Sequence, residues 1–356
     1  MPKPLTPLQK IFGPAPARSP RCAGGRWRRW FGLGLAWLVL ALVSVWAVAA
    51  LWFDVPVPIL RAPLAVAYGL GVVAVWIFAR RRLVAMSLTA GGFVLVLVWW
   101  FTLAPSNDRD WQPDLAVLPW AEVSGNRVLI HHVRYCDYRT ELDFDVRHAD
   151  RTFDLDQLQT VDMFLVHWGA PLIAHMMVSF TFQDADPVCF SIEVRKEKGE
   201  GYSALKAFFR QFELTYVIAD ERDLVRLRTN YRQGEDVTLY RVRMTPEKAR
   251  RLFLQYLRRA NELKARAEWY NVLTSNCSTG IHLDADAAPR FQNRWDWRIL
   301  ANGRSDQMLY ESGVLAGDLP FAELKQKCSI NARSRAADHA ADYSKQIRAG
   351  LPGQGP

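Results

Sequence analysis

The chain has 356 residues and a formal net charge of +9, and 50% of its residues are hydrophobic. The apolar residues are concentrated in the first hundred positions, which excludes a fully soluble chain. Many of the cations are arginines that flank this apolar region, so the basic charge gives no indication of nucleic-acid binding, and we expect no nucleic-acid partner.

Three apolar runs predict a membrane anchor over residues 30–103. They cover residues 30–53, 62–79 and 83–103, lengths close to the ~20 residues with which a helix crosses a hydrocarbon core. The second run is the shortest, and it contains Pro63 and Gly69. A cleaved signal peptide does not explain the pattern, because two further apolar runs follow the first.

Arginine placement predicts the orientation of this anchor. Residues 1–29 are rich in arginine, Arg80, Arg81 and Arg82 separate the second and third runs, and the loop at residues 54–61 holds one arginine. The positive-inside rule therefore places the N-terminus in the cytoplasm and everything after the third span outside. We expect a multi-pass protein of a bacterial inner membrane with a periplasmic C-terminal domain.

The rest of the chain is long enough for one folded domain. We expect a linker at residues 104–119, a domain at 120–330 and a flexible tail at 331–356. The predicted class is α+β, an antiparallel sheet with packed helices. Alternation and β-branched residues predict the strands, and Pro246 opens a helix at residues 247–263. The expected strands are residues 127–135, 161–168, 174–182, 188–194, 212–219 and 236–243.

A hairpin over residues 174–194 carries two residues with potential chemistry. Side chains alternate between the faces of a strand, so burying the apolar positions puts His175 and Glu193 together on the opposite face. The turn at residues 184–187 places them opposite or diagonal to each other. A histidine base with an orienting carboxylate needs this arrangement. The alternative is an ordinary ion pair on a solvent-facing sheet.

Cys277 follows residues that favour a helix start. Ser275 and Asn276 are strong N-cap types, and a helix N-terminus lowers the pKa of a thiol. The alternative is a small buried side chain. Among the remaining cysteines, Cys136, Cys189 and Cys328 could form a disulfide whose pairing the sequence does not reveal. No metal-binding spacing is present, and we expect no metal and no cofactor.

The order of these motifs resembles one family, that of the Lnb N-terminal periplasmic domain. The similarity rests on the histidine and glutamate strands, Phe-Glu-Leu-Thr-Tyr at 212–216, Ala-Asp-Glu-Arg-Asp at 219–223, Arg-Thr-Asn-Tyr-Arg at 228–232 and Asn-Cys-Ser-Thr at 276–279. It extends from about residue 120 to about residue 315. In Lnb itself the periplasmic domain precedes the membrane spans, whereas here the three apolar runs come first.

The resemblance implies a circularly permuted papain-like fold of the NlpC/P60 type, with the histidine strand first and the cysteine helix last. It implies Cys277 as nucleophile, His175 as base and Glu193 as the third, polar member. We expect Asn276 to support an oxyanion. Arg228 and Arg232 have two interpretations, a salt-bridge network that holds a helix to the sheet or a grip on a phospholipid headgroup.

The sequence therefore predicts a membrane-anchored periplasmic acyltransferase that works through an acyl-thioester. The expected partners are membrane lipids and, as acceptors, lipoproteins. Two alternatives remain, a cysteine amidase or peptidase acting on cell-wall peptide and a non-enzymatic module that binds an envelope partner.

Overall fold

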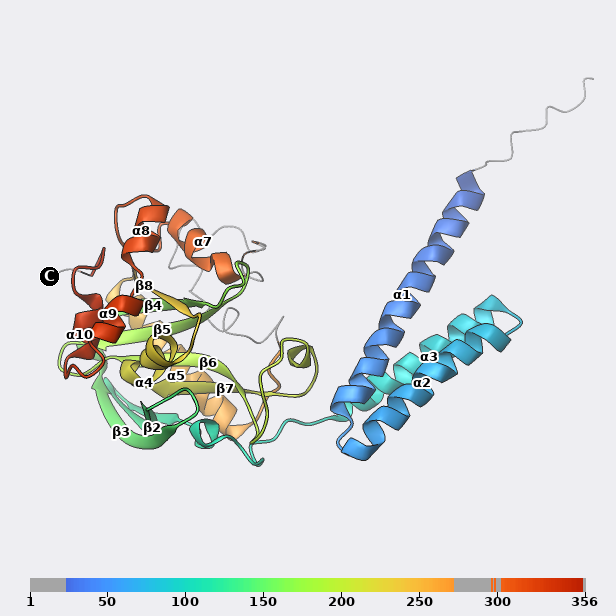
Figure 1. The fold of residues 1–356 in the computed structure, drawn as a ribbon, viewed down its shortest axis with the longest axis horizontal. Helices are drawn as coiled ribbons and strands as arrows, with labels where there is room; N and C mark the ends of the chain where they lie inside the picture. Colours follow the sequence, from blue (N-terminus) through green and yellow to red (C-terminus); the bar gives the residue numbers. More distant parts are fainter. Residues whose placement is uncertain (1–23, 272–295, 297, 299–301, 355–356) are drawn as a thin grey trace, which may run out of the picture. The chain divides into compact units, whose positions relative to one another are not determined.

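The computed structural model describes residues 24–271, 296, 298 and 302–354, which divide into two compact units at Thr102 and Leu103 (Figure 1). The first unit holds three helices, α1 (Gly24–Asp54), α2 (Pro58–Phe78) and α3 (Arg82–Thr102). Residues 30–54 of α1, all of α2 and all of α3 are long and apolar enough to cross a membrane. The predicted anchor is therefore confirmed as three apolar helices.

A polar contact connects two of these helices. The indole Nε1 of Trp100 donates to Oδ2 of Asp54 at 2.7 Å, which connects the ends of α3 and α1. Most of the large apolar side chains on the three helices remain exposed. Such an all-round apolar surface is typical of helices that face lipid.

The second unit is built on one sheet of eight strands in the order β1-β2-β7-β6-β5-β4-β8, with β3 paired to β2. All pairings are antiparallel except β2 with β7, so the sheet is mixed and not purely antiparallel as expected. The α+β class is confirmed. The strands are β1 (Trp120–Ser124), β2 (Arg127–Tyr138), β3 (Phe144–Asp154), β4 (Leu158–His167), β5 (Ala174–Phe182), β6 (Val188–Arg195), β7 (Glu213–Ala219) and β8 (Asp236–Val242).

Alternation along β5 and β6 produces two cores, one on each face of the sheet. On one face Val178, Phe180 and Phe190 pack with Phe253 and Tyr256 of helix α5 (Pro246–Ala265). Its buried side chains lie on one stripe, because an amphipathic helix presents one apolar side to a sheet. The predicted apolar face of the hairpin and the predicted inner face of this helix are confirmed.

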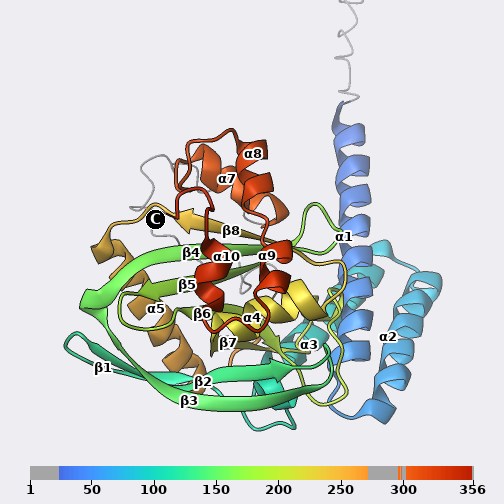
Figure 2. The same cartoon turned by 60° about the vertical axis from the view of Figure 1, so that its left-hand side comes forward.

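The opposite face of the hairpin is also covered, so it is not a solvent-facing sheet. Helices α4 (Glu221–Arg226), α9 (Asn331–Ala336) and α10 (Tyr343–Arg348) lie over it, on the side away from α5 (Figure 2). Met177 and Cys189 pack there with Tyr343 and Ile347. A pair on this face is therefore shielded from bulk water.

The expected flexible tail at residues 331–356 is wrong for most of its length. Tyr343 is 2% exposed and Ile347 is fully buried. Arg348 reaches under the sheet, where its guanidinium contacts Asp162 at 2.8 Å and Glu221 at 2.5 Å. The prediction of a flexible tail relied on the polar composition of this segment and overlooked its few buried apolar residues. Two further helices, α7 (Ser305–Glu311) and α8 (Phe321–Lys327), precede it.

Residues 104–119 run along the second unit and are fastened to it. The backbone N–H of Ser106 donates to Glu213 at 3.1 Å, and the amide of Asn107 donates to the carbonyl of Leu263 at 3.0 Å. Trp111 pairs with Glu197, and the guanidinium of Arg195 lies 4.2 Å from the Trp111 ring centroid. This segment thus forms part of the folded unit.

Three cysteines of the second unit are free thiols. Cys136, Cys189 and Cys328 are buried in three separate clusters and form no disulfide. Burial raises the pKa of Cys136 and of Cys328 to about 12, and it raises the pKa of Cys189 well above its ordinary value. At neutral pH these thiols are protonated and poor nucleophiles.

Candidate functional site

The β5–β6 hairpin brings His175 and Glu193 into contact, as the alternation predicts. The pairing of Met177 with Ser191 sets the register, so Glu193 lies across from the start of β5. The distance from Nε2 of His175 to Oε1 of Glu193 is 3.1 Å. His175 is 8% exposed and the side chain of Glu193 is 24% exposed, so the imidazole is buried and the carboxylate is partly shielded from water.

Ser191 connects the two residues and was not singled out from the sequence. Its Oγ lies 2.7 Å from Nε2 of His175 and donates to Oε1 of Glu193 at 2.6 Å. Because the hydroxyl hydrogen points at the carboxylate, the hydroxyl accepts the hydrogen on Nε2. A neutral imidazole here carries its proton on Nε2 and its lone pair on Nδ1. In the sequence, the alternation of side chains could have identified Ser191, because it lies on the same strand face as Glu193.

Arg228 completes the network from a different element. It lies in a π-helical turn at Leu227–Tyr231 that directly follows α4. Its guanidinium donates to Oε1 of Glu193 at 2.9 Å and lies 3.5 Å from Glu235. π-Helical turns are frequent at functional sites, and this turn places the guanidinium of Arg228 beside Glu193 near the end of β6.

These neighbours set the charge of Glu193. Burial by itself would raise the pKa of this carboxyl, but the charges of His175 and Arg228 and the hydrogen bonds outweigh it, so the pKa of Glu193 is held well below its usual range. Glu193 therefore stays ionised at neutral pH. An ionised carboxylate next to an imidazole favours and orients the protonated ring.

Arg232 belongs to a second, more exposed set of ion pairs. It contacts Glu141 at 3.1 Å and Glu235 at 3.5 Å. Through Glu235 it adjoins Arg228, but it does not contact Glu193. The contacts of both arginines are those of a salt-bridge network, and a phospholipid headgroup site at Arg228 and Arg232 stays a prediction.

Cys277 and Asn276 lie outside the described residues, but the chain on either side of them is bonded to the sheet. On one side the N–H of Tyr270 donates to the carbonyl of Phe212 at 2.9 Å, at the start of β7. On the other side Oδ1 of Asn302 accepts from the N–H of Ala174 at 2.9 Å. Cys277 is the sixth residue after Asn271.

Gly303 explains the tight return of the chain at this point. A Cβ on Gly303 would lie 2.6 Å from backbone atoms of Pro171, Leu172 and Ile173. Its own carbonyl lies 3.0 Å from Nε2 of His167, which is thus engaged in holding this junction. Only glycine permits this close approach of the two backbone segments.

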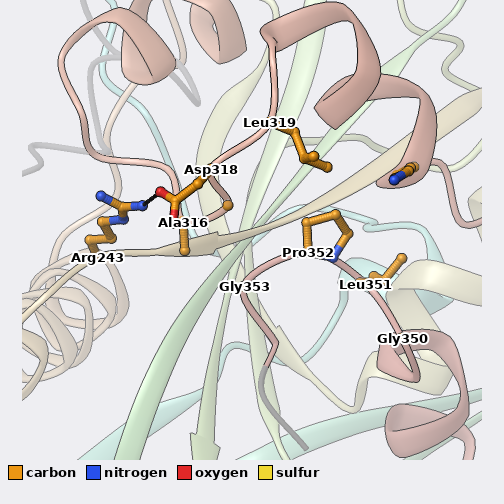
Figure 3. A pocket seen from close by; sticks show the side chains of 10 residues that line it. Arg243, Ala316, Asp318, Leu319, Gly350, Leu351, Pro352 and Gly353 are labelled. Carbon is orange, nitrogen blue, oxygen red and sulfur yellow. Dashed lines mark hydrogen bonds and ion pairs between the residues drawn. The ribbon is translucent and has the colours of Figure 1, made fainter.

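No group of three His, Cys, Asp or Glu side chains within the described ranges could hold a metal ion. A hollow of about 610 Å³ lies elsewhere, between residues 316–319 and the C-terminal residues 350–353 (Figure 3). Arg243 and Asp318 pair there at 2.7 Å with largely exposed side chains. The hollow shares no residue with the His175 network, and its exposed ion pair suits a solvated surface.

Comparison with known proteins agrees with the resemblance seen in the motifs. Residues 145–303 match the family model described as the Lnb N-terminal periplasmic domain. The match is shorter than the range expected from the motifs, but it includes every candidate site residue. No curated protein matches the chain, and no solved structure matches it.

Proposed function

Residues 145–303 belong to the Lnb N-terminal periplasmic domain family, and from that premise we propose that the protein is a cysteine-dependent acyltransferase of the bacterial envelope. With three apolar helices ahead of this domain, it is a membrane-anchored periplasmic protein. The observation that carries the proposal is the desolvated chain of contacts from His175 through Ser191 to Glu193 and Arg228. Such a chain fixes both the tautomer and the orientation of a catalytic imidazole.

We propose Cys277 as the nucleophile that this imidazole serves. An extended chain spans at most ~3.6 Å per residue, so the six residues from Asn271 to Cys277 can span at most about 22 Å. Asn271 follows Tyr270, whose backbone is bonded beside the start of β7. In the proposed geometry Nδ1 of His175 takes the thiol proton, and the thiolate–imidazolium pair is stabilised by Glu193.

The proposed reaction has two halves. The Cys277 thiolate attacks the ester carbonyl of a phospholipid, and the lysophospholipid leaves as an alcohol after taking a proton from His175. The amine of a lipoprotein cysteine then attacks the thioester, its proton passes to His175, and the thiolate leaves. The backbone N–H of Cys277 and the side chain of Asn276 are the proposed oxyanion donors.

Transfer of a labelled acyl chain tests this proposal. Purified full-length protein in phospholipid vesicles should form a hydroxylamine-sensitive acyl adduct at Cys277, seen in its intact mass, and should acylate a diacylated lipopeptide. Cys277→Ala and His175→Ala should abolish transfer. His339→Ala is the matched control, because the side chain of this histidine is 94% exposed and pairs with Asp338 at 3.3 Å.

The alternatives give different results in the same experiment. Release of peptide from cell-wall fragments without acyl transfer would replace the acyltransferase with an amidase. If the folded protein shows neither activity, the remaining interpretation is a non-enzymatic module that binds an envelope partner.

The proposal includes an orientation for the anchor. The arginines before the first helix and Arg80–Arg82 before the third favour a cytoplasmic N-terminus and three crossings. A reporter enzyme that works only in the periplasm should be active when fused after Pro105 and silent when fused after Arg82. The reverse pattern would overturn the orientation.

A further inference from the structure

The connection between β6 and β7 exposes three large apolar side chains. Tyr202, Leu205 and Phe208 are 52%, 59% and 44% exposed. They are spaced three residues apart, and a short 3₁₀ turn at residues 206–208 directly follows Leu205 and contains Phe208. Between them Ala207 is fully buried. We call Tyr202, Leu205 and Phe208 the apolar ridge. The buried side chain of Ala207 fixes this connection to the domain.

A second connection adds apolar surface at the same end of the sheet. Trp168, Leu172 and Ile173, between β4 and β5, are 39%, 46% and 49% exposed. β5 begins at Ala174 and its antiparallel neighbour β6 ends at Arg195, so both connections leave the sheet at one end. His175 and Glu193 lie at this end. Large exposed apolar side chains gathered at one end of a folded unit are typical of an interaction site.

Covalent connectivity links this end of the sheet to the third apolar helix. Thr102 is the last residue of α3, the third apolar helix, and Leu103 follows it directly. The carbonyl of Leu103 accepts from the side chains of Arg210 and Trp269. Arg210 follows Phe208 by two residues. Adjacent Cα atoms are 3.8 Å apart, so the ridge is tethered within a few residues of the point where the third helix ends.

The segment after Leu103 is bonded to the folded domain from its first residues. The backbone N–H of Ser106 donates to Glu213, and the amide of Asn107 donates to the carbonyl of Leu263, as described above. These bonds begin shortly after the end of α3, so the free chain between the helix and the domain is short. Lys206 within the connection between β6 and β7 adds a cation that suits lipid phosphates.

We propose that the apolar ridge docks on the lipid bilayer, with Leu205 and Phe208 inserted at the boundary between headgroups and acyl chains. Aromatic and aliphatic side chains flanked by cations favour this zone. The end of the sheet that carries His175 then faces the lipid surface. This inference uses the membrane anchoring of the protein and does not require acyl-transfer chemistry.

Photo-crosslinking to lipid tests the docking. The full-length protein would carry benzoylphenylalanine in place of Leu205, Phe208 or Leu142, in vesicles of phosphatidylethanolamine and phosphatidylglycerol with a radiolabelled phospholipid. Leu142 is the matched control, because it is 89% exposed and lies between β2 and β3, at the opposite end of the sheet. Lipid adducts at positions 205 and 208 should exceed those at 142 by about tenfold.

Equal adducts at the three positions would overturn the proposal. In native membranes, adducts to a protein in place of lipid would also overturn it and would make the ridge a protein-docking surface. The crosslink should persist in Cys277→Ala, which separates it from the proposed function. Lipid crosslinking without any acyl transfer would support the docking of the apolar ridge and contradict the proposed acyltransferase. Acyl transfer without lipid crosslinking would contradict only the docking of the ridge.

Discussion

Two hydrogen-bond donors and the ring nitrogen Nε2 of His175 lie close to a single oxygen of Glu193. Ser191 donates at 2.6 Å, Arg228 at 2.9 Å, and Nε2 of His175 lies at 3.1 Å. A carboxylate that accepts several charged or polar donors strongly favours its ionised form. In the proposed mechanism Glu193 positions His175, because its contacts are to the imidazole and to Arg228.

Glu193→Gln keeps the shape of the side chain and removes the charge that orients His175. We expect a fall in kcat of roughly 10²–10⁴-fold with KM little changed and some activity retained, since a positioning residue forms no bond to the substrate. Steady-state kinetics of the acyl transfer measure this. Glu235→Gln is the control, because the ion pairs of Glu235 are with Arg228 and Arg232.

Equal losses in the two variants would mean that Glu193 acts through Arg228 and the fold.

Because the pKa of Glu193 is depressed, its ion pairs contribute stability above the ordinary carboxyl pKa, and this stability is lost only as the pH falls through the depressed value. No acid limb from Glu193 should therefore appear in the neutral range.

At the scale of single elements, α4 is a helix of one and a half turns held by its cap and by its buried face. Oδ1 of Asp220 accepts from the N–H of Arg222 at 2.7 Å. Glu221 and Asp223, in the first turn, are 0% and 1% exposed. Asp223 pairs with Arg134 at 2.7 Å and Glu221 with Arg348 at 2.5 Å, so α4 joins the sheet to the C-terminal segment.

Asp220→Asn should stabilise the protein at neutral pH. Burial raises the pKa of Asp220 from 3.8 to about 6, so the folded state holds the proton more tightly than the unfolded chain, and stability is lost as the pH rises through this range. Asparagine caps equally well without the charge. We expect a gain of about 1–3 kcal/mol in the free energy of unfolding at pH 7 and none below about pH 4.

Chemical denaturation at the two pH values measures this gain. Asp220→Ala removes the cap as well as the charge, so it should be less stable than Asp220→Asn by about 1 kcal/mol at either pH. A gain for Asp220→Asn that is the same at both pH values would contradict the titration of Asp220.

At the scale of the whole molecule, the C-terminal segment closes the second core. Asp162 of β4 and Glu221 of α4 are fully buried, and Arg348 contacts both. Arg241 supplies a second cation to Asp162 at 2.6 Å. Two carboxylates buried without a cation between them would repel each other and lose their solvation, so Arg348 is required by the packing of three elements.

Arg348→Met should therefore be strongly destabilising. Removing one partner of a buried ion pair costs about 3–5 kcal/mol, because the remaining charge is left uncompensated. We expect a fall of about 10 °C in the thermal unfolding midpoint of the detergent-solubilised protein. Arg243→Met removes the exposed pair with Asp318 (Figure 3) and should cost about 0–1 kcal/mol. Similar losses in both variants would contradict a special role for Arg348.

The sequence by itself determined the features that repeat within one element. The three apolar helices follow from composition, and the faces of β5, β6 and α5 follow from periods of two and of 3.6 residues. His175 and Glu193 could be paired because a single short turn separates their strands. β3 was missed, because it is a largely exposed strand with almost no apolar alternation.

Only the tertiary structure decided which distant groups meet. Arg228 reaches Glu193 from 35 residues away through a π-helical turn, and Arg348 reaches Asp162 from 186 residues away. The polar C-terminal segment is ordered for the same reason, because a few buried anchors and one guanidinium outweigh its composition. Alternation is a property of the local backbone, whereas the choice of partner for a charge depends on how the whole chain returns to the sheet.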